Sequence, residues 1–254
     1  CGKQTPVYAG VDRPLMRQAS YAYFFHGSDG MGEMNYPEAA QPLQPQHGVL
    51  ALIEAVRRYP GEITLVTLGP LTNIALALAL APDIVQKVQA VYVMGGAANT
   101  TGNVTPAAEF NIWVDPEAAR MVFAAGMPLM MVGWENCRGE ANLDDAEMES
   151  MRAMRTPFAD FSIDCNMTAI KANRDLWSDA GLSLPDPVTM AVALDPSICD
   201  RRGKYFVDVE TSSEMTRGAT VVDETGVTQK TPNVEVCWTI HPQRWKEALY
   251  RTLR

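Results

Sequence analysis

The sequence lacks the features by which several common classes of protein are recognised. Its five cysteines are scattered and form no C-x-x-C pair, so neither a zinc site nor a redox dithiol is indicated, and a reducing compartment is favoured. No apolar run approaches the roughly 18 residues that a membrane-spanning helix needs, and no charged-then-apolar signal segment opens the chain. We therefore predict a cytoplasmic protein with no membrane partner.

Clusters of basic residues are also lacking. The formal charge is −9 at pH 7, and Lys and Arg do not gather in any segment, which argues against a nucleic-acid polymer as partner. A small neutral or cationic ligand, or a metal ion, fits this charge better. With 254 residues, of which 47% are hydrophobic, the chain can bury a sizeable core. No shift in composition marks a boundary, so we predict a single domain over residues 1–254.

The first half of the chain alternates between helix and strand patterns. Apolar residues at helical spacing predict a helix over 47–59. A buried strand at 63–68, a helix at 72–81 and a second strand at 90–94 complete a β-α-β unit. Such a crossover joins parallel strands through a right-handed connection.

The second half continues this alternation. The D-P-E pattern at 115–117 predicts a helix that has Asp115 as its N-cap and ends near Gly126. A short strand at 6–10 is expected to enter the sheet in its middle. The remaining expected elements are a strand at 128–132, helices at 144–154, 158–172, 188–194 and 241–253, and short strands at 205–210, 220–223 and 234–238. We predict an α/β fold with a Rossmann-like open, mostly parallel sheet flanked by helices, and a small strand-rich appendix near the C-terminus.

A polar loop after the strand at 90–94 is the strongest candidate for a binding site. Ligands of open α/β sheets bind beyond the carboxyl ends of the strands, where this loop would lie. Asn103, Glu109 and Asn111 supply amide donors, amide acceptors and a carboxylate, which suits the hydroxyl groups of a sugar. Surface loops also collect Asn and Glu, so an ordinary loop is the alternative.

Two further polar residues each have a structural and a functional interpretation. Asp186 precedes an apolar helix, so it is either the N-cap of that helix or an oxygen ligand of a hard cation such as Ca²⁺. His26 opens the glycine-rich segment H-G-S-D-G, where it either bonds to a neighbour in the loop or contacts a ligand.

Seven short strings stand out along the chain. They are V-Y-A-G-V-D-R-P-L at 7–15, H-G-S-D-G at 26–30, G-P-L-T-N-I-A at 69–75, M-G-G at 94–96, G-N-V-T-P-A-A-E-F-N at 102–111, D-P-E-A-A at 115–119 and D-P-V at 186–188. In this order they resemble the strings of the nucleoside hydrolases, including the inosine-uridine preferring members. The match runs from Pro6 to about Leu194 and is highly specific, because seven strings agree in sequence order.

The resemblance implies an enzyme that hydrolyses the N-glycosidic bond of purine or pyrimidine ribonucleosides to ribose and free base. It also implies a Ca²⁺ ion, held by the Asp186 carboxylate and the Leu68 backbone carbonyl, that activates a water molecule. The residues that would bind the ribose are Met94, Asn103, Glu109, Asn111 and Asp186. The partner is then a small nucleoside, and the full-length family member is expected to be a homo-oligomer, either a dimer or a tetramer.

The chain departs from the family in a motif that it does not contain. Family members begin with D-x-D-P-G-x-D-D, which supplies further calcium ligands and the general base, and no such string occurs in the 254 residues. We interpret the chain, which starts at Cys1, as amino-terminally truncated. The missing strand is expected to be central, so we predict poor stability and no activity for this chain alone.

A second departure concerns the leaving group. Inosine-uridine preferring members carry His before the Asp-Pro pair, where this chain has Pro185, and proline has no proton to donate. The candidates for contacting the departing base are His26, Glu135 and Trp134, the last by stacking unless it is a core aromatic. The alternative function is a non-catalytic nucleoside- or sugar-binding protein, and a third is a sugar-binding lipoprotein anchored through Cys1.

Overall fold

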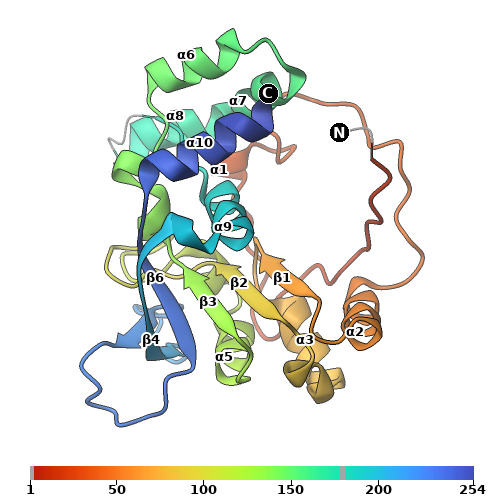
Figure 1. Ribbon diagram of the computed structural model, residues 1–254, viewed down its shortest axis with the longest axis vertical. Coiled ribbons are helices and arrows are strands. Elements are labelled where there is room, and N and C mark those ends of the chain that lie inside the picture. The colour runs from red at the N-terminus through yellow and green to blue at the C-terminus, as the bar shows by residue number, and fades with distance from the viewer. Residues whose placement is uncertain (1–2, 178–180) are drawn as a thin grey trace. The chain divides into compact units, whose positions relative to one another are not determined.

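The computed structural model describes residues 3–177 and 181–254, and the chain divides into two compact units (Figure 1). The first, here called the sheet unit, comprises Cys1–Ala19, Ala39–Glu135 and Arg201–Thr239. The second, the helical unit, comprises Ser20–Glu38, Asn136–Asp200 and Ile240–Arg254. The single domain stays a prediction.

Six strands form one mixed sheet in the order β1-β2-β3-β6-β4-β5. Their bounds are Thr64–Thr67 for β1, Ala90–Met94 for β2, Leu129–Val132 for β3, Cys199–Val209 for β4, Thr220–Asp223 for β5 and Val234–Ile240 for β6. β1, β2, β3 and β6 pair in parallel, and β5 runs antiparallel to β4. The predicted α/β class, with a mostly parallel sheet, is confirmed.

The strands of the predicted strand-rich appendix near the C-terminus are part of the main sheet. β6 pairs directly with β3, in a register that sets Val132 opposite Cys237, and β4 and β5 extend the sheet beyond it. β6 belongs in the interior because Val234, Val236 and Trp238 are all buried in the core. Sequence patterns identify these residues as strands but carry no information on which distant strand they join.

The helices of the sheet unit cover the parallel strands. Their bounds are Gly48–Arg58 for α2, Thr72–Leu80 for α3, Phe110–Val114 for α4 and Pro116–Ala124 for α5, with a 3-10 helix η1 at Pro82–Gln86. α2 buries Val49, Ile53 and Val56, which are spaced as one face of a helix. α3 packs against both α2 and α5 (Figure 1). Burying side chains of this size stabilises the fold by about 1.5 to 3 kcal/mol each.

A fully buried carboxylate joins three segments of the sheet unit. Asp115 is the N-cap of α5, as predicted, and its Oδ1 accepts a hydrogen bond from the amide of Ala118 at 3.1 Å. Its Oδ2 accepts hydrogen bonds from the Leu15 amide at 2.9 Å and the Thr72 hydroxyl at 2.7 Å. Three donors offset the cost of burying this charge, so Asp115 anchors the amino-terminal loop and α3 onto α5.

The helical unit contains most of the remaining helices. Their bounds are Tyr23–His26 for α1, Asp145–Ala153 for α6, Pro157–Asp164 for α7, Met167–Trp177 for α8, Pro185–Leu194 for α9 and Pro242–Leu253 for α10, with 3-10 helices η2 at Trp134–Cys137, η3 at Gly139–Ala141 and η4 at Pro196–Ile198. α10 is anchored by Trp245, which is buried and donates its indole N–H to the Ala141 carbonyl at 3.0 Å.

Three local predictions are wrong. The single helix expected over 158–172 is two helices, because the Asn166 side chain bonds the Ser162 carbonyl at 2.9 Å where α7 ends. The strand expected at 6–10 is an isolated bridge between Tyr8 and Gln44, outside the sheet. The N-cap of α9 is Leu184, so Asp186 lies inside the first turn of that helix.

The sheet has no vacant position between its strands. β1 pairs with β2 along Thr64 to Thr67, and in the described part of the chain β2 is its sole neighbour. Any further strand must therefore join at an outer edge, beside β1 or β5.

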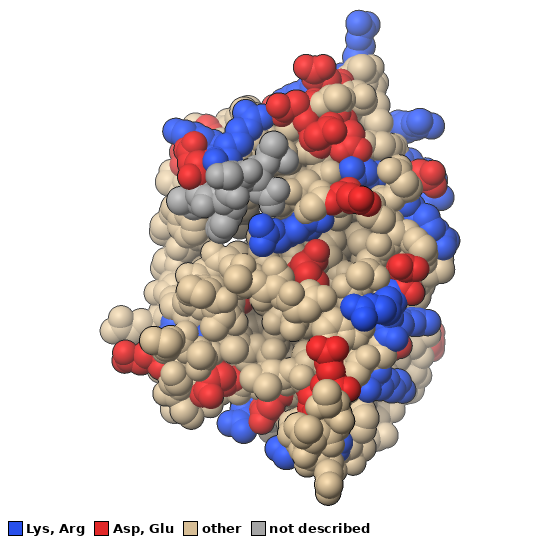
Figure 2. Space-filling model, turned by 90° about the vertical axis from the view of Figure 1, so that its left-hand side faces the viewer, with Lys and Arg blue, Asp and Glu red and all other residues tan. Residues whose placement is uncertain are grey.

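The surface carries mixed charges. Figure 2 shows one face on which acidic and basic side chains lie interspersed among uncharged ones. Asp83, for example, accepts from both Arg57 and Lys87 at 2.6 Å, and these hydrogen bonds lower the pKa of its carboxyl group. Such exposed pairs contribute little stability. None of the helices within 3–177 and 181–254 combines the length and apolarity that a membrane crossing requires.

Candidate active site

The carboxyl ends of three parallel strands meet at one edge of the sheet unit. β1 ends just before Leu68, β2 ends at Met94, and β3 is followed by Gly133. Because these strands are parallel neighbours, their carboxyl ends lie side by side, which is where ligands of open α/β sheets bind. The structure therefore brings the predicted polar loop to the expected edge.

Glu109 is the most buried polar residue of this loop, with 2% of its surface exposed. It is the N-cap of α4, and its Oε1 accepts from the Asn111 amide at 2.9 Å. Its Oε2 accepts from the Gly96 amide at 3.0 Å, which ties the start of α4 to the end of β2. Backbone donors hold the carboxylate in one orientation and offset its burial.

The two asparagines are held by backbone contacts within the same loop. Asn103 accepts from the Phe110 amide through Oδ1 at 2.8 Å, so its NH₂ group remains as a donor. Asn111 donates through Nδ2 to the Met94 carbonyl at 3.2 Å and approaches the Met94 sulfur at 3.1 Å, so its Oδ1 remains as an acceptor. Met94, Asn103, Glu109 and Asn111 thus form one connected group, in which both asparagines are half-buried and can reach a ligand.

Glu135 supplies a second carboxylate at this edge, beyond β3, and the residue is half-buried. Its Oε2 accepts from the Ala98 amide at 3.3 Å, whereas its Oε1 is buried and has no hydrogen-bond partner among the described residues. Burial raises the pKa of Glu135 from its ordinary value of 4.5 to about 7, although backbone donors act in the opposite direction. A carboxyl group with such a pKa can hold or release a proton near neutral pH.

The other candidates for contacting the base differ in exposure. Trp134 is 5% exposed, and its backbone amide donates to the Gly96 carbonyl at 2.8 Å, so its ring behaves as a core aromatic. His26 ends α1 in the helical unit, where its ring lies edge-on to Phe25 with centroids 5.0 Å apart. His26 is exposed to solvent, and partial desolvation by its neighbours lowers its pKa.

Asp186 belongs to the helical unit, on the first turn of α9. Its side chain caps no amide of that helix, which removes the structural explanation considered for it. Desolvation of the carboxylate by the surrounding residues raises the pKa of Asp186 from 3.8 to about 6. An acidic group in this condition is suited to binding a cation.

The residues predicted to hold Ca²⁺ do not make a complete metal site. Leu68 lies in the sheet unit and is 37% exposed, and Asp186 lies in the helical unit. Across the described residues, no group of three or more His, Cys, Asp or Glu side chains is arranged to hold a metal ion. Ca²⁺ usually takes about six to eight oxygen ligands, so one carboxylate and one carbonyl are donors of the right kind but supply only part of such a ligand set.

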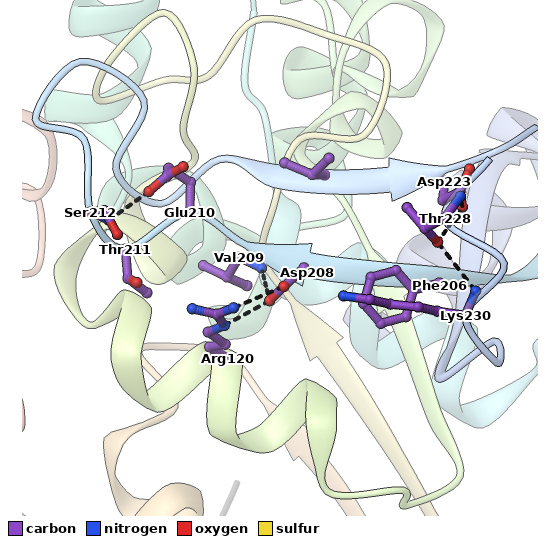
Figure 3. Close-up of a pocket in the computed structure, with 11 residues that line it drawn as sticks. Arg120, Phe206, Asp208, Val209, Glu210, Thr211, Ser212, Asp223, Thr228 and Lys230 are labelled. Carbon is purple, nitrogen blue, oxygen red and sulfur yellow. Dashed lines mark hydrogen bonds and ion pairs between the residues drawn. The ribbon is translucent and has the colours of Figure 1, made fainter. Parts of the chain in front are cut away.

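A separate hollow of about 360 Å³ lies on the β4–β5 hairpin of the sheet unit (Figure 3). Its carboxylates are engaged within the hollow. Asp208 pairs with Arg120, Glu210 accepts from the Ser212 amide, and Asp223 accepts from Thr228. The predicted site residues are not among those that line it. The hollow is therefore distinct from the strand-end group around Glu109.

Comparisons with known proteins identify the family of the chain. Residues 1–247 match the family described as inosine-uridine preferring nucleoside hydrolase. The chain belongs to this family. It is similar to the pyrimidine-specific ribonucleoside hydrolase RihA of Shewanella sp. (strain ANA-3), with 38% identity over 249 residues, which cover 98% of this chain and 77% of the relative.

Solved structures of nucleoside hydrolases share the fold. The plant nucleoside hydrolase PpNRh1 superposes with a TM-score of 0.91 at 29% identity, covering 98% of this chain and 80% of that one. A purine-preferring ribonucleoside hydrolase from Gardnerella vaginalis superposes with a TM-score of 0.88 at 28% identity, covering 98% of this chain and 79% of that one. These relationships support the assignment of the chain as a ribonucleoside hydrolase.

Two contacts beside this candidate site, made by Thr220 and Gly96, were missed by reasoning from the sequence. Thr220 of β5 exchanges two hydrogen bonds with the backbone of Ala97, although 123 residues separate them. No sequence signal indicates this contact. Gly96, by contrast, is the last residue of the M-G-G string, and its φ of +85° is a conformation that favours glycine.

Proposed function

We propose that this chain binds a ribonucleoside through its ribose at the carboxyl end of β2, as the first step of hydrolysing the N-glycosidic bond. The observation that carries the proposal is the connected group of Met94, Asn103, Glu109 and Asn111. It offers one donor at Asn103 and one acceptor at Asn111 beside a buried carboxylate. A vicinal pair of ribose hydroxyls both donates and accepts, so these groups complement it.

The buried carboxylate also suits the chemistry of the bond cleavage. Hydrolysis of a glycosidic bond develops positive charge on the sugar ring in an oxocarbenium-like transition state. Glu109 is 2% exposed and held by backbone amides, so little reorganisation is needed when that charge develops. The Glu135 carboxyl, whose burial raises its pKa to about 7, is our preferred group for contacting the departing base, ahead of His26 and Trp134.

The proposed metal is Ca²⁺, with the Asp186 carboxylate and the Leu68 carbonyl among its ligands. A bound calcium ion would orient two ribose hydroxyls and lower the pKa of a water molecule. Because these two residues are too few to retain the ion, we propose that the 254-residue chain alone binds Ca²⁺ weakly and turns over nucleosides little, if at all.

Pyrimidine nucleosides are the proposed first substrates, because the RihA relative is named pyrimidine-specific.

A homo-oligomer is proposed for the full-length protein, to be checked by analytical ultracentrifugation. We also propose that the protein acts in the cytoplasm, since its five cysteines are scattered along the chain and form no C-x-x-C pair.

The decisive experiment measures ribose binding and nucleoside cleavage separately. D-ribose is titrated into the chain in millimolar Ca²⁺ and followed by NMR, and release of reducing sugar from uridine and inosine is measured in parallel. Glu109→Gln is expected to weaken ribose binding about tenfold or more, because a charged acceptor is lost. Glu149→Gln, on the exposed face of α6, is the matched control and is expected to bind ribose normally.

The alternative function is a non-catalytic nucleoside- or sugar-binding protein, and both functions predict ribose binding. Cleavage separates them once the ligand set is complete. If adding the family's aspartate-rich segment to the amino terminus restores cleavage, the enzyme is supported, whereas binding without cleavage supports the alternative. Failure of the wild-type chain to bind ribose would refute both, and full turnover by the 254-residue chain would refute its proposed inactivity.

A further inference from the structure

Three consecutive backbone amides after β2 are each held by a side chain from a different part of the chain. The Gly96 amide donates to Glu109 Oε2 at 3.0 Å, the Ala97 amide to Thr220 Oγ1 at 3.0 Å, and the Ala98 amide to Glu135 Oε2 at 3.3 Å. All of these residues belong to the sheet unit. Loop amides commonly bond to water or to nearby residues, so three distant side chains on consecutive amides form a dedicated clamp.

The Thr220 contact is the tightest part of this clamp. Its hydroxyl accepts from the Ala97 amide and donates to the Ala97 carbonyl, both at 3.0 Å. Thr220 is 6% exposed and Ala97 is 8% exposed, so water has little access to replace either bond. Removing the hydroxyl would leave a buried N–H and a buried C=O unpaired together.

Space around Gly96 restricts the loop further. A Cβ at this position would lie 2.8 Å from the Thr220 methyl group and 2.9 Å from the Met131 sulfur. The Gly96 carbonyl also accepts from the Trp134 amide at 2.8 Å. These contacts restrict where the backbone of Gly96 can lie, and they therefore fix the amide that donates to Glu109 Oε2.

We propose that Thr220 and Glu135 are positioning residues for ribose binding, because they hold the loop 96–98 in the place from which Gly96 orients Glu109. This inference rests on the proposed ribose site. According to this proposal, Thr220 of β5, a strand at the edge of the sheet, contributes to the ribose affinity of a site at the end of β2. Neither residue needs to touch the sugar.

The test uses Thr220→Val, which keeps the shape of the side chain and removes its hydroxyl, and Thr220→Ser, which keeps the hydroxyl. D-ribose is titrated into the 254-residue chain in millimolar Ca²⁺, and hydrogen exchange is measured at the amides of residues 96–98. Ribose carries no base, so a leaving-group role of Glu135 does not affect the result. Thr220→Val is expected to bind ribose about tenfold more weakly, a factor equal to ~1.4 kcal/mol. It is also expected to speed exchange at Ala97.

Thr220→Ser is expected to restore ribose binding to within about twofold of wild type, because it restores both hydrogen bonds. Equal ribose affinity of Thr220→Val and wild type, even with a lowered thermal midpoint, overturns the positioning role and leaves the proposed function standing. Absence of ribose binding by the wild-type chain overturns the proposed function and the positioning role together.

A second variant covers the case in which Thr220→Val does not fold. Glu135→Met has a similar shape and no acceptor for the Ala98 amide, and it replaces a carboxyl whose Oε1 lacks a partner among the described residues. We expect it to fold and to bind ribose several-fold more weakly. Unchanged ribose affinity in Glu135→Met would then overturn the proposal.

Discussion

The buried Glu135 carboxyl should make the stability of the protein depend on pH in an unusual direction. Its pKa is about 7 in the folded protein and near 4.5 when unfolded. Between these values the folded state binds more protons than the unfolded state, so stability falls as pH rises. The stability that Glu135 contributes to the folded protein is fully present below pH ~4.5 and is lost as the pH rises through about 7.

The size of the effect follows from the shift. A pKa that rises from 4.5 to about 7 corresponds to roughly 3 kcal/mol, at about 1.36 kcal/mol per unit. Glu135→Gln removes the titration and keeps the shape and an acceptor for the Ala98 amide. The variant should therefore match wild type near pH 4.5 and exceed it in stability by up to roughly 3 kcal/mol near pH 8.

The assay is urea unfolding of both proteins at half-unit pH steps from 4 to 8.5. Low protein concentration is needed, because protonation reduces the net charge of −9 that keeps the chain soluble. The free energy of unfolding of wild type is subtracted from that of the variant at each pH. All other titrating groups, including Asp186, cancel in this difference. A difference that stays flat between pH 4.5 and 7 would refute the assigned protonation of Glu135.

The remaining predictions concern burial, capping and backbone conformation. Asp186→Asn should stabilise the calcium-free protein by up to roughly 3 kcal/mol at pH 8, because desolvation raises the pKa of Asp186 to about 6 and the variant carries no charge there. The variant should also show no rise in thermal midpoint with Ca²⁺. A larger calcium response in the variant than in wild type would contradict this prediction. Asp115→Ala should lower the free energy of unfolding, measured with urea, by about 3 to 5 kcal/mol, and Asp144→Ala should lower it by about 1 kcal/mol. The costs differ because the N-cap Asp115 is buried and the N-cap Asp144 is exposed. Equal losses in the two variants would show that burial of the cap does not matter. Gly96→Ala should lower the free energy of unfolding by about 2 to 5 kcal/mol, and Gly126→Ala should lower it by about 1 to 2 kcal/mol. Both glycines have a positive φ, but only Gly96 lacks space for a Cβ. Equal costs for the two variants in calorimetry would argue against crowding at Gly96.

Local chemistry explains why much of the fold could be predicted from the sequence. The strand 90–94 has the bounds of β2, and the 47–59 helix pattern matches α2 because one face carries apolar residues at regular spacing. Asp115 caps α5 as expected, because an N-cap needs nothing beyond its own helix. Family strings carried the assignment of function, and the polar loop lies at the strand ends as parallel topology requires.

Tertiary structure decided the features that depend on distant residues. The pairing of β6 with β3 and the clamp of Thr220 on Ala97 join segments about a hundred residues apart, and no local pattern encodes such partners. Burial likewise raised the pKa values of Glu135 and Asp186, because residue type sets only the reference pKa and the shift from it depends on the surroundings of the group. The sequence by itself determined most of the elements, the family and the polar loop, while the tertiary structure decided which side chains hold the backbone amides of that loop in place.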